Sequence, residues 1–341
     1  MVVDLRSDLC SLPTEEMWQA MRDAELGWAT AREDGSVRRL EETAAGLLGH
    51  EASVFVPTCG MANLAALLVH AERGVGVVLE SAAHILTSEG MAITEIAGLE
   101  PFAVWAPDGR LDPARVDETF ADTRATVLAL ENTHTRAGGT VVGAERTREL
   151  VEVARRHGAR VHLDGARLVN AAVALGVELS ELAHDVDSVA LSLNKGLSAP
   201  YGCVLAGRGA FVEKARTQLL RLGGGTVHRA GLLAAAGLVA LERMRERVAD
   251  DHRRARELAE RLSRIEGLHL EPERVETNIV LVDVTGTGYE PAAFVTELAG
   301  RGVRALERDG SRIRLVTHRL VVDDDIEVAA AAVADVVASA G

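Results

Sequence analysis

Lysine is almost missing from this 341-residue chain, which has 35 arginines and only two lysines. Lys195 follows an apolar run, Asp187 to Asn194, and opens onto the Gly-rich turn from Gly196 to Pro200. A lysine amine can lose its proton and attack a carbonyl, whereas a guanidinium stays charged. A lysine at the end of a strand therefore indicates Schiff-base chemistry. Lys214 lies in a helix-like stretch, FVEKARTQLL, and fits an ordinary surface position.

Other scarcities exclude further classes of protein. The three cysteines (Cys10, Cys59 and Cys203) lie far apart without a CxxC pair, so neither a disulfide framework nor a metal site is expected. A net charge of −14 and ten aromatic residues argue against nucleic-acid binding. The N-terminal residues lack the apolar region of a signal peptide, and no apolar run has the length of a membrane span. We expect a soluble, cytoplasmic protein.

Short β-rich runs alternate with helical patterns from residue 53 onward. Since these runs are apolar throughout, they predict strands that are buried on both faces of a mostly parallel α/β sheet. Only Lys195 to Tyr201 separates the last two runs, too short for a crossover helix, so this pair should be antiparallel. The predicted strands are Ser53–Pro57, Gly76–Glu80, Pro101–Trp105, Thr126–Glu131, Arg160–Asp164, Ser188–Leu193 and Gly202–Ala206. The predicted helices between them include Met61–Arg73, Ala144–His157 and Leu168–Leu175.

The remaining residues predict a second, smaller unit. A long charged helical pattern from Gly231 to Arg264 reads as a connector. Beyond it the sequence predicts strands at Thr277–Val284 and Ser311–Val316, a helix near Pro291–Gly302, and a helix after Asp323. We expect a large domain at 1–245, with an N-terminal strap, and a small α+β domain at 246–341.

Polar residues gather where the predicted strands end. Ligands of open α/β sheets bind at the carboxyl ends of the strands. The residues found there are Thr58-Cys59-Gly60, His84, Glu131 to His134, Asp164 to Arg167, and Asn194-Lys195.

This order of residues matches the needs of pyridoxal phosphate. The Thr58-Cys59-Gly60 turn would offer backbone N–H groups to the phosphate. Asp164 would pair with the protonated ring nitrogen. His84 would cover the ring and serve as acid or base. Arg167 would reach the ring hydroxyl or a substrate carboxylate, although Asp164 and Arg167 would also suit a structural ion pair. Lys195 would join the cofactor aldehyde.

At these residues the chain resembles the L-threonine aldolases, within the β-eliminating lyase group of fold type I pyridoxal phosphate enzymes (the aspartate-aminotransferase-like superfamily). The resemblance covers nearly the whole chain. Its motifs are DLRSD (4–8), EDGSVRRLE (33–41), ENTHTRAGG (131–139), HLDGARLVNAAVALGV (162–177), NKGLSAPYG (194–202), LGGG (222–225), AGLLAAAGLVALE (230–242) and IRLVTH (313–318). It implies a large domain with a seven-stranded mixed sheet and a small C-terminal α+β domain.

The resemblance also implies roles for individual residues. Lys195 would hold pyridoxal 5′-phosphate, Asp164 would face the ring nitrogen, and His84 would stack on the ring. Ser7, Arg167 and Arg314 would grip the substrate carboxylate, and His84 and His134 would surround the β-hydroxyl. The reaction implied is cleavage or formation of the Cα–Cβ bond of an L-β-hydroxy-α-amino acid. Family members are tetramers or dimers with active sites between subunits, so Arg229 and the N-terminal strap would serve a neighbouring subunit.

Several positions depart from the family pattern. A Ser-Gly-Thr phosphate turn becomes Thr58-Cys59-Gly60, two tyrosine positions become Ala31 and Ser88, and the serine before the catalytic lysine becomes Asn194. An apparent insertion in Thr226–Arg229 displaces an arginine. These substitutions in the predicted pocket indicate a different side chain on the substrate, or another reaction at Cα or Cβ: β-elimination, transaldolation or decarboxylation. A binding or regulatory protein without turnover would have lost Lys195 or the carboxylate grip, and both are present.

Overall fold

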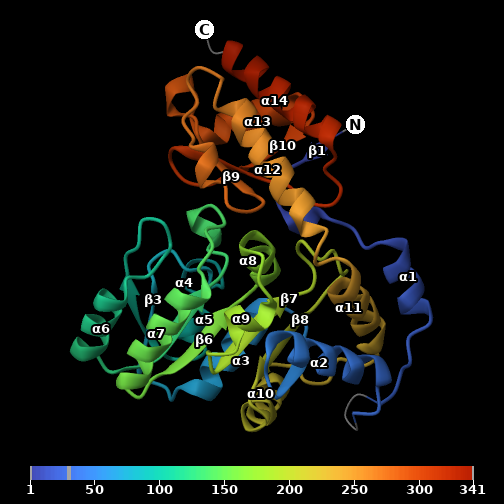
Figure 1. Ribbon diagram of the computed structural model, residues 1–341, viewed down its shortest axis with the longest axis vertical. Coiled ribbons are helices and arrows are strands. Elements are labelled where there is room, and N and C mark those ends of the chain that lie inside the picture. The colour runs from blue at the N-terminus through green and yellow to red at the C-terminus, as the bar shows by residue number, and fades with distance from the viewer. Residues whose placement is uncertain (1, 29–31, 340–341) are drawn as a thin grey trace.

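The computed structural model describes residues 2–28 and 32–339. It has two lobes, a larger one around a central sheet and a smaller one that contains the C-terminal helix (Figure 1). The central sheet has seven strands in the order β2-β8-β7-β6-β5-β3-β4. Their bounds are β2 Ala52–Val56, β3 Gly76–Glu80, β4 Glu100–Val104, β5 Ala125–Glu131, β6 Arg160–Asp164, β7 Ser188–Ser192 and β8 Cys203–Gly207.

All seven predicted strands are confirmed, each within one residue at either end. The mixed direction is confirmed as well, because β8 runs antiparallel to both of its neighbours, β7 and β2. The other neighbouring pairs in the sheet are parallel. The carboxyl ends of β3, β5, β6 and β7 therefore meet along one edge, with Glu131 of β5 directly opposite Asp164 of β6.

Helices cover both faces of this sheet, and alternation along each strand shows why. In β7, Val189 and Leu191 enter one apolar core while Ala190 between them enters the core on the opposite face. Successive side chains of a strand point to opposite faces, so a strand that is apolar throughout needs two covers. The larger lobe's helices of eight or more residues are α1 Glu15–Arg22, α2 Gly35–Leu48, α3 Cys59–His70, α6 Pro113–Asp122, α7 Ala144–Arg156, α8 Leu168–Leu175, α10 Gly209–Arg221 and α11 Gly231–Arg243.

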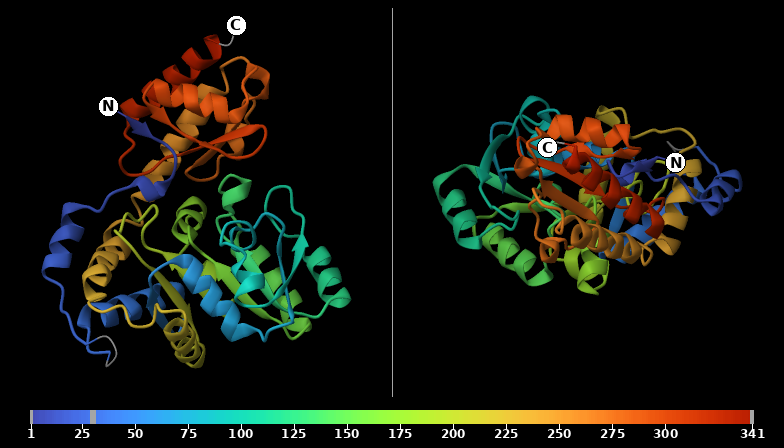
Figure 2. Two further views of the ribbon diagram at one scale, coloured as in Figure 1. Left: turned by 180° about the vertical axis from the view of Figure 1, so that it is seen from behind. Right: turned by 90° about the horizontal axis from the view of Figure 1, so that it is seen from above.

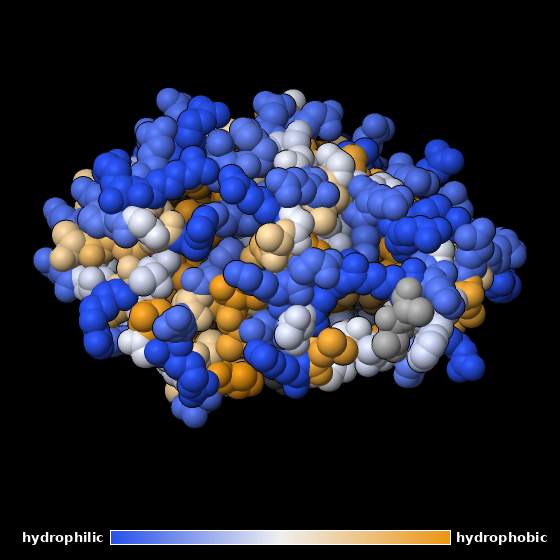
Figure 3. Space-filling view, turned by 90° about the horizontal axis from the view of Figure 1, so that it is seen from below, coloured by the Kyte–Doolittle hydropathy of each residue, from blue (hydrophilic) through white to orange (hydrophobic). Residues whose placement is uncertain are grey.

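Shorter helices complete the larger lobe, and two of them, α4 and η3, begin a few residues after the ends of β3 and β5. They are η1 Asp8–Cys10, α4 His84–Thr87, α5 Ala92–Glu95, η3 Thr135–Ala137 and α9 Leu179–Ala183. Seen from below, the base of this lobe is mostly hydrophilic, with apolar side chains in smaller patches (Figure 3). Among the described helices, none combines the length and the apolar character that crossing a bilayer requires.

The smaller lobe has its own apolar core. The predicted connector from Gly231 to Arg264 is two helices, α11 and α12 Val248–Leu262, which are separated by Met244–Arg247. A three-stranded antiparallel sheet, β11-β12-β9, packs with α12 and α13, and α14 packs on these two helices. The remaining bounds are η4 Pro272–Arg274, β9 Ile279–Asp283, η5 Thr285–Thr287, α13 Pro291–Gly300, β10 Val303–Arg304, β11 Leu306–Glu307, β12 Arg312–Val316 and α14 Asp323–Ala338.

The first strand of the chain lies in the smaller lobe. β1 (Val3–Asp4) pairs in parallel with β10, so Val3 lies opposite Val303. Figures 1 and 2 both place the N-terminal strand beside the small lobe, after which the chain descends past α1 along the larger one. Val3 and Leu5 are both buried in the small-lobe core. The N-terminal strap therefore ties the two lobes together, and the domain boundary after residue 245 stays a prediction.

The strap should contribute measurably to stability through Leu5, which is fully buried. We expect Leu5→Ala to lower the free energy of unfolding by about 2–5 kcal/mol, because it removes apolar contacts and leaves a cavity. Val2→Ala is the matched control: Val2 is 54% exposed in the same segment. Its effect should stay within about 0.5 kcal/mol. Urea unfolding of both variants tests this, and equal losses would contradict the packing of the strap.

Candidate active site

Lys195 is presented by a tightly closed loop between β7 and β8. The Ser198 N–H donates to the Lys195 carbonyl at 2.9 Å, and the Ala199 N–H donates to the Leu193 carbonyl at 2.9 Å. Ser198 has a left-handed backbone with φ of 62°, a conformation uncommon for residues other than glycine. Its hydroxyl is buried and lies 2.7 Å from the Ser11 hydroxyl of the strap. These bonds fix the loop, and the half-buried Lys195 side chain emerges from it at the sheet edge.

Asp164 ends the neighbouring strand, β6, and its side chain is almost fully buried. Its carboxylate accepts hydrogen bonds from the Ala166 N–H and from Asn63 Nδ2, both at 3.1 Å. Burial raises the pKa of Asp164, and the nearby Glu131 carboxylate raises it further, while Lys195 opposes the shift. No cation forms an ion pair with Asp164 within the described residues. A buried carboxylate in this condition is an acceptor for a positive charge.

Asn63, on α3, is held by a buried chain of hydrogen bonds. Its Oδ1 lies 3.0 Å from His162 Nε2, and His162 Nδ1 lies 2.8 Å from Ser188 Oγ. His70 Nε2 lies 2.7 Å from the same hydroxyl. Because Asn63 Nδ2 donates to Asp164, Oδ1 must accept from His162, which then accepts from Ser188. Burial lowers the pKa of His162 to about 3 and that of His70 to about 4, so both rings are neutral at neutral pH.

Glu89 is a second buried carboxyl group in this site. Asn63 Nδ2 donates to Glu89 Oε1 at 2.8 Å, so one amide serves both Glu89 and Asp164. Burial, reinforced by the Asp164 charge, raises the pKa of Glu89 to about 7. A Cβ atom placed on Gly60 would lie 3.5 Å from the Glu89 carboxyl carbon, so Glu89 borders the Thr58-Cys59-Gly60 turn. Two adjacent buried carboxyls do not both ionise readily, so the Asp164 charge favours the protonated form of Glu89.

The Thr58-Cys59-Gly60 turn lies at the N-terminus of α3. Thr58 caps this helix, since its side chain accepts from the Met61 N–H at 3.2 Å. The N–H groups of the first helical residues, Cys59 and Gly60, have no partner inside the helix. With the positive end of the helix dipole they suit an anion such as a phosphate.

His84 begins α4 and stands beside the same carboxyl groups. Its backbone N–H donates to Glu131 Oε2 at 2.7 Å, which fixes its position across the sheet edge. Its side chain is 36% exposed, and Nε2 lies 3.9 Å from Glu89 Oε1. Burial lowers the pKa of His84, with the Lys195 charge acting in the same direction and the Asp164 charge opposing it. The ring is therefore neutral near pH 7 and able to accept a proton.

The three residues predicted to grip a carboxylate come together at the lobe boundary. Asp8, next to Ser7, binds Arg167 through two contacts of 2.8 Å, and Arg167 Nη1 donates to Thr135 Oγ1 at 3.0 Å. Burial opposes ionisation of Asp8, but Arg167 outweighs it and lowers the pKa of Asp8 to about 2. Arg314 Nη2 donates to the Arg6 carbonyl at 3.1 Å, and its Nε is buried without a partner. Arg314 thus keeps more donors available than Arg167, each of whose three nitrogens already donates one hydrogen bond.

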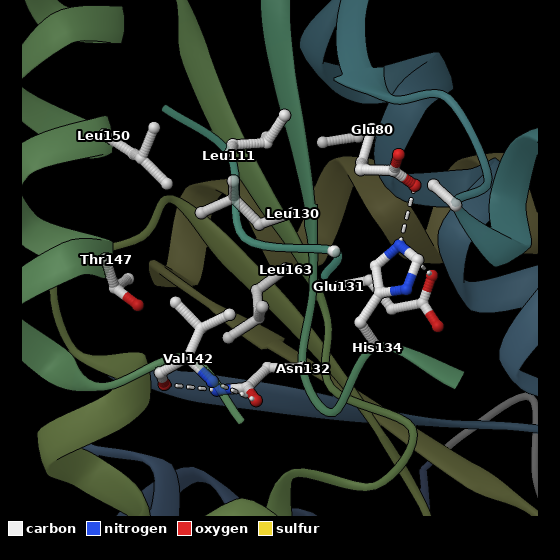
Figure 4. A pocket seen from close by; sticks show the side chains of 13 residues that line it. Glu80, Leu111, Leu130, Glu131, Asn132, His134, Val142, Thr147, Leu150 and Leu163 are labelled. Atoms are coloured by element: carbon white, nitrogen blue, oxygen red, sulfur yellow. Dashed lines mark hydrogen bonds and ion pairs between the residues drawn. The ribbon is translucent and has the colours of Figure 1, made fainter. Parts of the chain in front are cut away.

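His134 lies deeper than the sequence suggests. It is 1% exposed, and its Nδ1 accepts from the Ala137 N–H at 3.2 Å. Its Nε2 lies 2.9 Å from Glu80 and 3.8 Å from Glu131. Figure 4 shows the ring directed at Glu80, with Leu130 and Leu163 among the apolar side chains farther along the pocket. Burial opposes protonation, but Glu80 and Glu131 outweigh it and raise the pKa of His134.

The other predicted positions lie at the margin of the site or outside it. Arg229 is exposed, with φ of 61°, just before α11 in the segment of the apparent insertion from Thr226. Ser88 accepts from Arg136 Nη2 at 3.3 Å, and Asn194 accepts from Ser192 Oγ at 2.8 Å. Ala31 lies outside the described residues.

Sequence reasoning missed Asn63, Glu89, Glu80 and the Asp8–Arg167 pair. Asn63 lies one helical turn after Gly60, on the face of α3 that meets the sheet, and that spacing was a usable signal. Glu131 stood in the strand-end list but had no role, and the structure puts it between His84 and Thr135. No spacing links Asp8 to Arg167, which are 159 positions apart.

The residues present fit pyridoxal phosphate. Asp164 offers a buried negative charge to a protonated ring nitrogen, and the turn before α3 offers N–H groups to a phosphate. The Lys195 charge adds to the lowering of the pKa of Asp8 and opposes the rise in the pKa of Glu89 and Asp164, so the amine lies near all three carboxyl groups. A ring between Lys195 and Asp164 would have His84 within reach.

Comparisons with known proteins point the same way. A family model described as beta-eliminating lyase matches residues 4–286. A low-specificity L-threonine aldolase of Arabidopsis thaliana is 38% identical over 95% of this chain and 93% of its own length. The Escherichia coli K12 low specificity L-threonine aldolase is 37% identical over 96% and 98%. The structure of Leishmania major threonine aldolase superposes with a TM-score of 0.84 at 17% identity, covering 98% of this chain and 99% of that one, and it supports the fold.

The shared contact of Asn63 with both carboxyls makes a first prediction for the site. Asn63→Ala leaves buried acceptors on Asp164 and Glu89 without their donor, which should cost about 1–3 kcal/mol of folding free energy. It should also weaken pyridoxal phosphate binding at least about tenfold, since Asp164 then favours its neutral form. Ser188→Ala is the control, because it breaks the chain at His162 while Asn63 still contacts Asp164. Equal cofactor affinities of the two variants, by fluorescence titration, would refute a direct role of Asn63.

The raised pKa of Glu89 makes a second prediction. A folded-state pKa of about 7 against an ordinary 4.5 means that folded protein retains a proton that the unfolded chain releases. The contribution of Glu89 to stability is therefore complete below pH about 4.5 and is lost as pH rises to about 7. Unfolding of the cofactor-free protein should show this loss, and Glu89→Gln should abolish it between these pH values. A variant whose stability falls as steeply as that of the wild type would contradict the assignment.

Proposed function

Because this chain belongs to the beta-eliminating lyase family, we propose that it cleaves or forms the Cα–Cβ bond of an L-β-hydroxy-α-amino acid such as threonine or allo-threonine. The products of cleavage are glycine and an aldehyde. The observation that carries the proposal is that Asp164 and Lys195 lie at the ends of two adjacent strands, β6 and β7. The Asp164 carboxylate is buried there, and no cation forms an ion pair with it within the described residues. The names of relatives 37–38% identical over nearly the whole chain support the reaction class.

Pyridoxal 5′-phosphate is the cofactor, and it withdraws electrons from Cα of the amino acid joined to it. Lys195 supplies the amine that holds it. Asp164 keeps the ring nitrogen protonated, and the hydrogen bond from Asn63 keeps Asp164 ionised. The N–H groups of Cys59 and Gly60 bind the phosphate.

Binding of the substrate carboxylate falls to Arg314, with Ser7 and Arg167 beside it. Arg314 has an unpaired buried Nε, whereas Asp8 and Thr135 engage Arg167. An arginine fork binds a carboxylate through two parallel hydrogen bonds. In this proposal Arg167 also fixes the position of the Asp8 carboxylate through its two hydrogen bonds.

His84 is the better base for the β-hydroxyl proton. Its ring is partly exposed, and its lowered pKa leaves the ring free to accept a proton at neutral pH. His134 is buried and its ring nitrogens already face the Ala137 N–H and Glu80. We propose that His134 takes part through Glu131, which lies 3.8 Å from His134 Nε2 and accepts a hydrogen bond from the His84 N–H.

Elimination at Cβ is the second candidate, and the position of Glu89 favours it. A carboxyl with a pKa of about 7 beside the cofactor cleft suits protonation of a leaving group. Elimination from a β-substituted alanine gives pyruvate and ammonia, whereas aldol cleavage gives glycine and an aldehyde. The two sets of products distinguish the candidates directly.

The proposal includes a homotetramer or homodimer with active sites at subunit interfaces. Apolar side chains exposed along the strap and near the Lys195 loop support a partner surface, since monomers rarely display many of them together. They are Leu9, Leu12, Trp18, Trp28 and Tyr201. Arg229 would then reach the neighbouring site. The three free cysteines suit a reducing compartment such as the cytoplasm.

The chain's two lysines give a matched test. Lys195→Ala should lower kcat for threonine cleavage by at least about a thousandfold, because the amine that holds the cofactor is gone. Lys214→Ala, on α10, should leave kcat unchanged. Borohydride reduction of the wild type and peptide mapping should place the pyridoxyl label on Lys195. A label on Lys214, or full activity of Lys195→Ala, would sink the proposal.

A further inference from the structure

Three arginines from different segments meet above the candidate site. Arg136 lies in η3, Arg308 follows β11, and Arg314 lies in β12. Arg308 Nη2 donates to the Arg136 carbonyl at 3.1 Å, while Arg314 Nη2 donates to the Arg6 carbonyl at 3.1 Å. Arg136 Nη2 donates to Ser88 Oγ at 3.3 Å. We call these three residues the arginine cluster.

The cluster lacks anions. Within the described residues, none of its guanidinium groups has a carboxylate oxygen within 4.0 Å. The Nε atoms of Arg308 and Arg314 are buried and have no hydrogen-bond partner. Neighbouring arginines are paired, since Arg312 contacts Asp309 at 2.6 Å and Arg167 contacts Asp8 at 2.8 Å. The three side chains are half-buried, and buried polar atoms in proteins are normally hydrogen-bonded, so the two unpartnered Nε–H groups favour binding of an anion.

The electrostatics agree with this geometry. Burial, together with the charges of Arg136, Arg312 and Arg314, outweighs the opposing charge of Asp309 and lowers the pKa of Arg308 to about 10. Burial and the charges of Arg167 and Arg136 lower the pKa of Arg314, while the charge of Asp8 opposes the shift. An anion bound among the three would relieve this repulsion.

The cluster borders the side of the site where a substrate's β-substituent would lie. Ser88, the partner of Arg136, is the C-cap of the short helix that begins at His84. The charge of Arg308 acts on His134, which lies across the sheet edge from it. In the proposed function a substrate α-carboxylate would bind Arg314, and Arg136 and Arg308 would still have no anion bound to them.

We propose that Arg136 and Arg308 form a second anion subsite, which selects β-hydroxy-α-amino acids whose β-substituent carries a carboxylate or a phosphate. The inference rests on the proposed function and deepens it. For β-hydroxyaspartate the Cα–Cβ bond breaks, the β-hydroxyl loses its proton and Cα gains one. The products are glyoxylate and glycine, and the atoms balance without a further reactant.

The kinetic test compares β-hydroxyaspartate with β-hydroxyasparagine, which have nearly the same shape but differ in charge. Wild-type holoenzyme should show at least a tenfold higher kcat/KM for the acid. Arg308→Gln should remove that preference, and Arg308→Lys should keep part of it. Arg274→Gln is the control for net charge, since Arg274 is an exposed arginine of the same lobe that pairs with Glu271 at 2.9 Å. It should leave both values unchanged.

A phosphate arm uses 4-phosphooxythreonine against 4-hydroxythreonine and tells which anion the subsite prefers. A preference for the anionic member of either pair that Arg308→Gln abolishes supports the proposal. Equal kcat/KM within both pairs, or a loss in Arg308→Gln that is the same for charged and neutral substrates, overturns it.

A binding arm separates this inference from the proposed function. L-Aspartate and L-asparagine lack the β-hydroxyl and cannot undergo aldol cleavage, yet they probe the same pocket. Calorimetric titration of the holoenzyme should give at least tenfold tighter binding of aspartate, and Arg308→Gln should abolish the difference. If no substrate yields glycine and an aldehyde but aspartate still binds tighter, only the aldolase assignment fails. Equal affinities for the two amino acids overturn the subsite itself.

Discussion

A negative charge buried without a cation of its own is the constraint on which this site depends. Asp164 is held at the end of β6 by the Ala166 N–H and Asn63, and burial pushes its pKa upward. Such a group is costly to keep ionised. A positive ring nitrogen beside Asp164 would offset this cost, so the buried carboxylate favours binding of the protonated cofactor. The chain from Asn63 through His162 and Ser188 to His70 provides a donor for Asn63 Oδ1 while the amide nitrogen donates to the acid.

The sheet and most of the chemistry at its edge were predictable from the sequence. Runs such as Val77–Leu79, apolar at every position, require cover on both faces, and the short link after Lys195 requires an antiparallel partner. Strand ends then bring Asp164 and Lys195 together, whatever the helices between them. Lys195 could be predicted as a functional residue because lysine is rare in this chain. A chain that uses arginine for surface charge has little need of lysine except where the chemistry requires an amine.

What escaped prediction depends on distance along the chain and on competition between partners. Arg167 was predicted to reach a ligand, and the two hydrogen bonds that it also makes to Asp8 depend on three-dimensional proximity alone. His134 follows a strand end, but its ring is buried and points toward Glu80, which lies 2.9 Å from Nε2. The break at Met244–Arg247 went unseen because the helical pattern continues through it. Glu89 gained its role from burial beside Asp164, which no periodicity encodes.

The placement of the first strand governs the order in which the molecule can be completed. Val3 pairs with Val303, and Asp8 contacts Arg167 and Asn278, which lie 159 and 270 positions further along. During synthesis Asp8 leaves the ribosome long before Asn278 is made. The Asp8 carboxylate therefore stays exposed to solvent until most of the chain has been synthesised. Closing so long a loop carries an entropic cost and slows folding. Capture of the coenzyme in its final geometry is therefore a late event in the life of each newly made chain, after the last strands have formed.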